Sequence, residues 1–241
     1  TLEQAEAMRR DFVANVSHEI RTPLTVLAGF VETLQTLQLD ESERQHYLAL
    51  MTQQSSRMQT LVSDLLTLSR LEGSPAPDLS RLTPFPQLIE QLRQDAAALS
   101  QTRTLELERP HLLVFENNFE GQIAGNVSEL LSAMGNLVSN AIRYTPAGAR
   151  ITVQSELLLD GSLVFSVQDT GPGIAPEHLG RLTERFYRVD RSRSRETGGT
   201  GLGLAIVKHV AQRHGATLSI ESSLGKGSTF RIMFPSDRIK P

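Results

Sequence analysis

The 241-residue chain contains no cysteine, which excludes disulfide bonds, thiolate nucleophiles and cysteine-ligated zinc and agrees with a reducing compartment. It also lacks a run of about 18 apolar residues, so no segment is expected to span a bilayer, and no signal peptide is recognisable. Basic residues are not in excess, because 24 Lys and Arg stand against 27 Asp and Glu. A domain that follows a phosphate backbone is usually basic, so direct binding of nucleic acid is not expected.

Residues 2–71 carry a helical pattern in two segments. In the first segment apolar residues recur three and four positions apart, at Val13, Val16, Ile20, Leu24, Leu27, Val31 and Leu34. A polar break at 39–43 precedes a second series, at Tyr47, Met51, Met58, Leu61, Leu65 and Leu68. Either Asp40 or Ser42 can cap this second helix. Two helices joined by a short turn cannot bury both apolar faces alone, so the pattern predicts a homodimer that forms a four-helix bundle.

Gly, Ser and Pro are concentrated in "EGSPAPD", residues 72–78, which predicts a linker. Beyond it helical and strand patterns are mixed, so the fold class is α+β. The predicted division is a helical hairpin over 1–72, a linker over 73–80, a second domain over 81–236 and a tail over 237–241.

Within the second domain, periodicity predicts helices and strands in turn. The expected helices cover about 85–100, 128–144 and the segment from Gly203 to about His214. The expected strands cover 104–108, 111–116, 149–159, 162–169, 216–222 and 228–234. The chain begins with Thr rather than Met, so we expect it to be part of a longer protein.

His18 lies on the polar side of the first predicted helix, five residues before Pro23. A proline inside a helix costs about 3 kcal/mol, and we expect it to bend the helix just past the histidine. Glu19 can accept a hydrogen bond or a proton from an imidazole, which makes the other ring nitrogen more nucleophilic. An isolated His-Glu pair is usually only a surface histidine, so its interpretation depends on the rest of the chain.

A second polar group lies on one face of the helix predicted over 128–144. Asn136, Asn140, Arg143 and Tyr144 are spaced by four, seven and eight residues from the first, so they share that face. Asparagine oxygens suit Mg²⁺, arginine suits an anionic phosphate, and tyrosine offers a flat surface for a base. Taken singly, such a polar face is more often merely solvated.

Two glycine-containing segments complete the pattern. "DTGPGI" places Asp169 at the end of a strand, where a carboxylate can accept the exocyclic amine of adenine, or can simply form an Asp-Gly turn. "GGTGLGLAIVKH" opens a helix with glycines whose N–H groups can surround phosphates. Its spacing is not that of a dinucleotide fingerprint. "GKGS" at Gly225 is not a P-loop, because Ile220 occupies the position of the first glycine.

Five segments, taken in order, resemble the H, N, G1, F and G2 boxes of sensor histidine kinases. They are "FVANVSHEIRTPL", "NLVSNAIRYTPAG", "DTGPGI", "RFYRVD" and "GGTGLGLAIVK". The resemblance covers nearly the whole chain. It implies a dimerisation and histidine phosphotransfer hairpin followed by an ATP-binding α/β sandwich of the Bergerat type. It also implies that the chain is the cytoplasmic portion of a bacterial inner-membrane protein.

In the hairpin the resemblance implies roles for three residues. His18 attacks the γ-phosphate of ATP and becomes a phosphohistidine. Glu19 orients and deprotonates its imidazole. Thr22 positions the water that dephosphorylates a partner protein.

In the second domain the resemblance implies a nucleotide site. Asn140 holds Mg²⁺, with Asn136 and Arg143 on the phosphates, and Arg188 reaches the γ-phosphate. Three residues bind the adenine: Tyr144, Asp169 and Thr229. The other implied nucleotide-binding residues lie in a mobile lid over about 171–203, and they are Gly171, Gly173, Ile174, Gly199, Thr200, Gly201, Leu202 and Gly203.

The implied partner is the aspartate of a response regulator. The segment "APEHLGRLTERFYRVDRSRSRETGG", which includes Thr183 where most of the family has Phe, is similar to the phosphate-regulon sensor kinases. Arg143 replaces the commoner Lys. The expected regulator is therefore that of the phosphate regulon, with a winged-helix output domain, and a kinase of another two-component pathway is the alternative.

Two further alternatives are an ATPase of the gyrase, Hsp90 and MutL kind and a non-catalytic adaptor. The nucleotide-binding fold implied for this chain resembles that of these ATPases. They carry a water-activating glutamate four residues before the metal-binding asparagine, and this chain has Asn136 at that position. An adaptor would be expected to have lost His18, Asn140 or the glycines.

We expect Lys208 and Arg213 to lie on a solvated helix face. The other histidines show no metal-ligand spacing and are interpreted as structural or surface residues: His46, His111, His178, His209 and His214.

Overall fold

The structure is a computed structural model that describes residues 2–104, 109–189 and 199–241. The chain divides into two compact units. The first comprises Thr1–Leu66 with Gly198–Thr200, and the second comprises Thr67–Thr197 with Gly201–Pro241. Among the described helices, none combines the length and apolar character that a membrane crossing requires.

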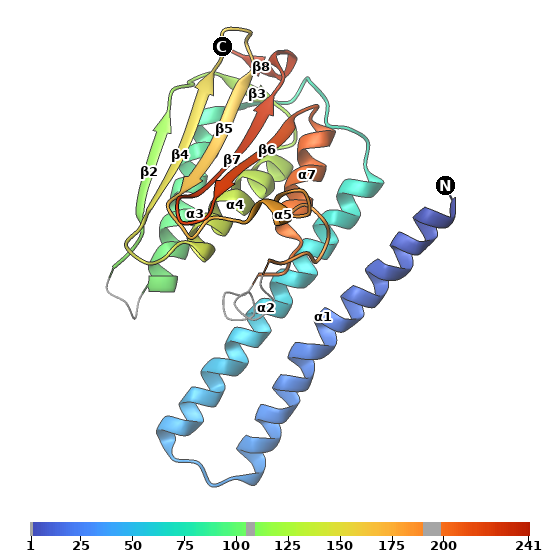
Figure 1. Cartoon of the computed structure of the whole chain (residues 1–241), viewed down its shortest axis with the longest axis vertical. Coiled ribbons are helices and arrows are strands. Elements are labelled where there is room, and N and C mark those ends of the chain that lie inside the picture. Colours follow the sequence, from blue (N-terminus) through green and yellow to red (C-terminus); the bar gives the residue numbers. More distant parts are fainter. Residues whose placement is uncertain (1, 105–108, 190–198) are drawn as a thin grey trace. The chain divides into compact units, whose positions relative to one another are not determined.

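Two long helices form a hairpin, α1 (Leu2–Thr36) and α2 (Glu41–Gly73) (Figure 1). The first unit contains α1 and most of α2, and the residues of α2 from Thr67 onward belong to the second unit. α1 continues through Pro23 without a break. The carboxylate of Asp40 accepts the N–H of Glu43 (2.8 Å), and the carboxylate of Glu43 accepts the N–H of Asp40 (3.0 Å). This reciprocal capping box identifies Asp40, rather than Ser42, as the residue that begins α2.

The core of the second unit is a five-stranded sheet in the order β2-β4-β5-β7-β6, in which only β2 and β4 are parallel. Its strands are β2 (Leu112–Asn117), β4 (Arg150–Leu157), β5 (Leu163–Asp169), β6 (Thr217–Ser223) and β7 (Gly227–Phe234). Three helices lie on one face of the sheet in Figure 1: α3 (Phe85–Thr104), α4 (Val127–Tyr144) and α7 (Gly203–Arg213). The chain is thus an α-helical hairpin followed by an α+β unit, as the sequence predicts.

Alternation along the strands explains why the sheet has one covered face. On β5, Phe165 and Val167 are at most 1% exposed and point toward the helices, together with Phe230 and Ile232 of β7. Leu137 of α4 is equally buried. Burial of such side chains contributes about 1.5–3 kcal/mol each and holds α4 against the sheet.

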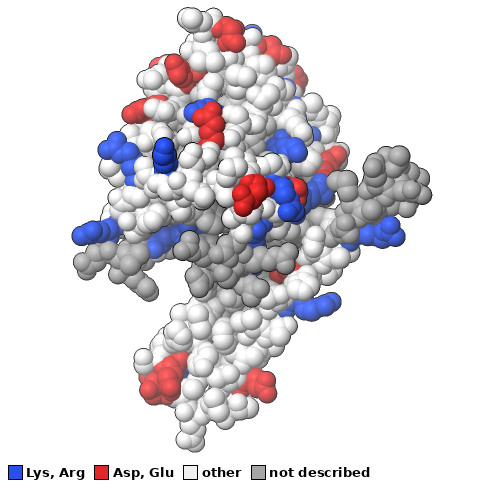
Figure 2. All heavy atoms as spheres, viewed as in Figure 1, with Lys and Arg blue, Asp and Glu red and all other residues white. Residues whose placement is uncertain are grey.

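The opposite face of the sheet is polar. It contains a cavity of about 280 Å³ lined mainly by polar side chains of β4, β5 and β7, among them Gln154, Gln168, Thr229 and Arg231. Acidic and basic side chains are interspersed over the surface that Figure 2 shows. The large apolar residues of these strands are therefore confined mostly to the helix-covered side.

Three short strands that periodicity does not predict form a second sheet. β1 (Leu82–Pro84), β3 (Gln122–Ala124) and β8 (Ile239–Lys240) are ordered β1-β3-β8. The expected tail over 237–241 therefore belongs to the fold, and the Arg238 side chain preceding β8 is buried. Strands of two or three residues are too short to show an alternating pattern. Of the strand expected over 104–108, Thr104 ends α3 and the remainder lies outside the described residues.

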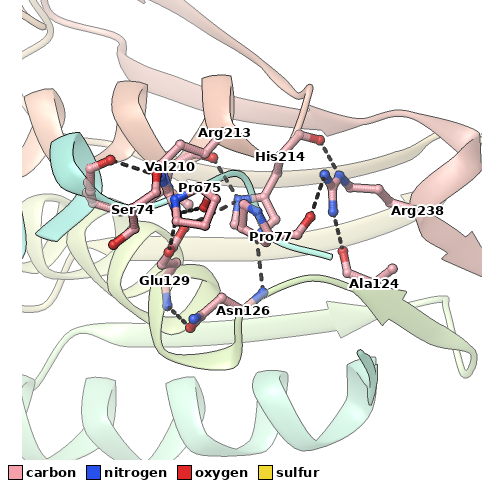
Figure 3. A network of polar contacts seen from close by, with 11 residues as sticks. Ser74, Pro75, Pro77, Ala124, Asn126, Glu129, Val210, Arg213, His214 and Arg238 are labelled. Atoms are coloured by element: carbon pink, nitrogen blue, oxygen red, sulfur yellow. Dashed lines mark hydrogen bonds and ion pairs between the residues drawn. The ribbon is translucent and has the colours of Figure 1, made fainter. Parts of the chain in front are cut away.

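Within the second unit, the linker is held by Arg213 at the end of α7 (Figure 3). Its guanidinium donates to both carboxylate oxygens of Glu129 (2.9 Å each). It also donates to three backbone carbonyls, those of Leu71 (2.9 Å), Ser74 (2.7 Å) and Pro75 (2.8 Å). All five N–H donors of the guanidinium are thus used. The expectation that Arg213 is solvated is wrong, since its side chain is only 12% exposed.

A second arginine continues the same network. Arg238 donates to the carbonyl of Pro77 in the linker (3.3 Å) and to those of His214 and Ala124 (3.1 Å for the latter). The His214 side chain is fully buried, and its Nε2 accepts the N–H of Asn126 (3.3 Å). His214 is therefore structural, as expected. We refer to the contacts of Arg213 and Arg238 with residues 71–77 as the linker clamp.

Candidate active site

His18 is exposed on α1, and its neighbours are held by the hairpin itself. The hydroxyl of Thr22 donates to the carbonyl of His18 one turn back (3.1 Å). The carboxylate of Glu19 pairs with Arg57 of α2 (3.3 Å), and the Arg57 side chain is only 11% exposed. The acidic neighbour of the histidine is thus tied to the second helix. Sequence reasoning missed Arg57, because no local spacing connects residues 38 positions apart.

The polar face of α4 forms one wall of a second site. α4 begins at the cap Asn126, whose side chain accepts the N–H of Glu129. Asn136, Asn140 and Arg143 are partly buried on the predicted face, and Tyr144 is 47% exposed at its end. This polar face of α4 therefore lies at the boundary between the core and the solvated surface.

Gly203 brings the start of α7 against this wall. A Cβ atom at Gly203 would lie 2.5 Å from Oδ1 of Asn136, closer than any real contact. The amide nitrogen of Asn136 donates to the carbonyl of Ser132 (2.8 Å), so its oxygen is the atom that faces the glycine. The predicted Asn-containing and Gly-rich motifs thus meet in space.

Asp169 ends β5 and forms a second wall. Its Oδ1 accepts the N–H of Gly171 (2.8 Å), which keeps the loop after the strand tightly turned. Burial raises the pKa of the Asp169 carboxyl, and the N–H groups of Gly171 and Ser228 partly offset this effect. Asp169 therefore presents a desolvated acceptor, which suits recognition of an amine.

The loop that follows Asp169 is fastened to the β6–β7 hairpin. The hydroxyl of Ser222 accepts the N–H of Ile174 (2.8 Å) and donates to the carbonyl of Gly227 (3.0 Å). The carbonyl of Pro172, next to Gly173, accepts the N–H of Gly225 (2.7 Å). Ser222 was not among the predicted site residues, because an isolated serine in a strand carries no distinguishing signal.

Thr229 lies away from this loop, contrary to the prediction that it supports the adenine edge. It pairs with Gln168 and lines the cavity on the polar face of the sheet, whereas Asp169 pairs with Ser228. Because side chains alternate along a strand, Ser228 shares the face of Asp169 and Thr229 does not. The error is one residue in register.

The remaining predicted residues fall in two places. In the second unit, Gly201 accepts the N–H of Phe186 through its carbonyl (2.8 Å), Leu202 is fully buried at the start of α7, and Arg188 is partly buried. Gly199 and Thr200 group with the first unit, where the Thr200 hydroxyl donates to Asp64 (2.6 Å). Residues 190–198 of the expected lid lie outside the described residues.

Comparison with known proteins follows the same division. Residues 8–74 match the His Kinase A (phospho-acceptor) domain. Residues 125–238 match the family of histidine kinase-, DNA gyrase B- and HSP90-like ATPases. The chain belongs to the sensor histidine kinases.

Among curated relatives, the phosphate regulon sensor protein PhoR of Pseudomonas aeruginosa is 50% identical over 96% of this chain and 51% of its own length. The chain therefore spans about half the length of the curated relatives it matches. Full-length ShkA, solved in complex with AMPPNP, is 28% identical with a TM-score of 0.63 over 93% of this chain and 45% of that one. ThkA, solved with the response regulator protein TrrA, shares the fold at 22% identity and a TM-score of 0.71, over 97% of this chain and 64% of that one.

Proposed function

We propose that this chain transfers the γ-phosphoryl group of ATP to His18 and then to an aspartate of a response regulator. The observation that carries the proposal is that α4 is contacted twice within the second unit, by Gly203 at Asn136 and by the Asp169 loop at its C-terminal end, while His18 is exposed on the hairpin. A nucleotide site and a nucleophile on different units suit a reaction in which the histidine first receives the phosphoryl group from ATP and then passes it to the response regulator.

In the transfer step, one ring nitrogen of His18 forms a bond to the γ-phosphorus and the bond to the bridging oxygen breaks, which releases ADP. Glu19 takes the proton from the imidazole. Asn140 would hold Mg²⁺, since its amide oxygen is a suitable hard ligand on the same face as Asn136. The ion, when bound, neutralises phosphate charge. Asp169 and Tyr144 hold the adenine, and Arg143 and Arg188 bind phosphate oxygens.

Asn136 argues against an ATPase of the gyrase and Hsp90 kind. Such an enzyme requires a carboxylate base at the position of Asn136, and here the side-chain nitrogen donates to Ser132 instead. An amide cannot accept the proton of water at neutral pH. Transfer to histidine avoids the need for that base.

Large apolar side chains of the hairpin support a homodimer. Those that are exposed in the single chain are Val13, Leu24, Val26, Val31, Leu37, Leu48, Val62 and Leu66. A second copy that completes a four-helix bundle would bury many of them, as the sequence predicts.

We further propose that the pathway is phosphate-starvation signalling, with a winged-helix regulator as partner, and that Thr22 supports dephosphorylation of that regulator. The chain would be the cytoplasmic portion of an inner-membrane protein. Support comes from relatives named as phosphate regulon sensors at 50% and 39% identity. A kinase of another two-component pathway is the alternative.

The test is incubation with γ-labelled ATP and Mg²⁺ for the wild type and His18→Ala, with His46→Ala as the control on an exposed histidine of the same hairpin. We expect acid-labile label in the wild type and the control and none in His18→Ala. Label on another residue, or none in the wild type, would refute the kinase. Faster transfer to regulators of other pathways would refute the phosphate-regulon assignment alone.

A further inference from the structure

Thr145, which follows Tyr144 at the C-terminal end of α4, has a buried hydroxyl group that lacks a hydrogen-bond partner among the described residues. The residue is 5% exposed, and its Oγ1 forms no hydrogen bond with any described residue. Buried hydroxyl groups in folded proteins nearly always have a partner, because leaving one unpaired costs free energy. Such an orphan is expected where a ligand or bound water completes the site.

The position of this hydroxyl is at the candidate nucleotide site. A Cβ atom built on Gly171 would lie 2.8 Å from Oδ1 of Asp169, 3.4 Å from Oγ1 of Thr145 and 3.4 Å from the carbonyl of Tyr144. The hydroxyl and the carboxylate therefore border the same glycine.

The backbone of Thr145 is fixed on both sides, so its hydroxyl is held in place. Its N–H donates to the carbonyl of Ala141 (3.0 Å). Its carbonyl lies 2.9 Å from Nε2 of His111, and His111 Nδ1 lies 2.8 Å from the hydroxyl of Ser100. A carbonyl can only accept, so Nε2 carries the hydrogen and Nδ1 accepts from Ser100. Thr145 is thus anchored by a buried network, and only its hydroxyl is left to bind something else.

We propose that the Thr145 hydroxyl is a second adenine-recognition group, which donates to ring nitrogen N1 directly or through one held water. The proposal rests on the proposed nucleotide site. Adenine presents a donor, the 6-amine, next to an acceptor, N1. Asp169 supplies the acceptor for the first, and Thr145 supplies the donor for the second. The hydroxyl has no hydrogen-bond partner among the described residues because its partner is an atom of the nucleotide.

The test compares three variants of the whole chain. Thr145→Val removes the hydroxyl at nearly constant volume, and Thr145→Ser keeps it. Thr229→Val makes the same change on the polar face of the sheet, away from Asp169, and serves as the matched control. For each variant, urea denaturation without nucleotide gives stability, and calorimetry gives the dissociation constants for ATP and for 1-deaza-ATP, in which carbon replaces N1.

We expect Thr145→Val to be at least as stable as the wild type, because an unpaired buried hydroxyl is removed, yet to bind ATP roughly tenfold more weakly. Thr145→Ser and Thr229→Val should bind ATP like the wild type. The wild type should lose a similar factor with 1-deaza-ATP, whereas Thr145→Val should lose little more with that analogue.

Unchanged ATP affinity in Thr145→Val would overturn the proposal. So would a loss of folding or stability in that variant, since a structural hydroxyl would then explain the burial. An equal penalty for 1-deaza-ATP in the wild type and Thr145→Val would overturn the assignment to N1. Failure of the wild type to bind ATP at all would instead refute the proposed nucleotide site, so the two failures are distinguishable.

Discussion

The turn between β6 and β7 offers a sharp test of how the backbone positions Asp169. Gly225 and Gly227 both have positive φ, 76° and 100°, a conformation that costs a residue with a side chain about 1–2 kcal/mol. Their surroundings differ. A Cβ atom at Gly225 meets nothing within 4 Å, whereas one at Gly227 would lie 2.0 Å from the carbonyl oxygen of Asp169 and 3.0 Å from Cα of Thr170.

Replacement of each glycine by alanine should therefore have unequal effects. Gly225→Ala should lower the free energy of unfolding by about 1–2 kcal/mol, the conformational penalty alone. Gly227→Ala adds a backbone clash that forces β7 away from β5, and we expect a total loss of about 3–5 kcal/mol. Because the clash is with Asp169 itself, ATP affinity should fall in Gly227→Ala and stay near the wild-type value in Gly225→Ala.

Urea denaturation measures both losses, and calorimetric titration with ATP measures the change at the site. Equal losses of stability in the two variants would refute the steric part of the reasoning. A destabilised Gly227→Ala variant that still binds ATP normally would refute the link between this turn and Asp169.

Three further predictions concern charged groups. Burial raises the pKa of Asp169, so ATP affinity should fall on acidification at a higher pH than an ordinary carboxyl would cause. Asp169→Asn should weaken ATP binding by about 1.5–3 kcal/mol and remove this pH dependence in calorimetric titrations. Arg57→Ala should release the carboxylate of Glu19 from α2 and raise the rate of autophosphorylation about two- to fivefold. The same substitution should have no effect on that rate in a Glu19→Gln background. An equal effect in both backgrounds would exclude coupling between Arg57 and Glu19. Burial lowers the pKa of His214, so the unfolded chain binds the extra proton. The stability of the second unit should thus fall as the pH drops below 6.5, the ordinary value, and His214→Gln should flatten the dependence seen in urea denaturation between about pH 7.5 and about pH 5.5.

Periodicity predicted the parts of the site that lie within one long element. The spacing from Asn136 to Tyr144 fixed their common face, since α4 is a single helix whose other side is buried. The turn at Asp160 and Gly161 fixed the pairing of β4 with β5. These are local consequences of sequence, and the motif order identified the family.

Contacts between distant elements could not be predicted in the same way. Neither the Arg57–Glu19 pair nor the five bonds of Arg213 leaves a local pattern, because each depends on which elements pack together. The prediction assigned the adenine contact to Thr229 rather than Ser228 because the choice depends on the register of β7 against β5. The position of Asp169 alone does not supply that register. The orphan hydroxyl of Thr145 became visible only once burial was known.

The linker clamp binds only main-chain oxygens, those of Leu71, Ser74, Pro75 and Pro77. Every amino acid has a main-chain oxygen, so the side chains of residues 71–77 can change during evolution, whereas the length of this segment is constrained. Single substitutions at Ser74 or Ala76 should be silent, whereas an inserted residue would move each oxygen out of reach of its arginine. A shortened protein that begins at residue 81 would likewise remove four of the acceptors of Arg213 and Arg238, so an independently folding second unit should start before Leu71.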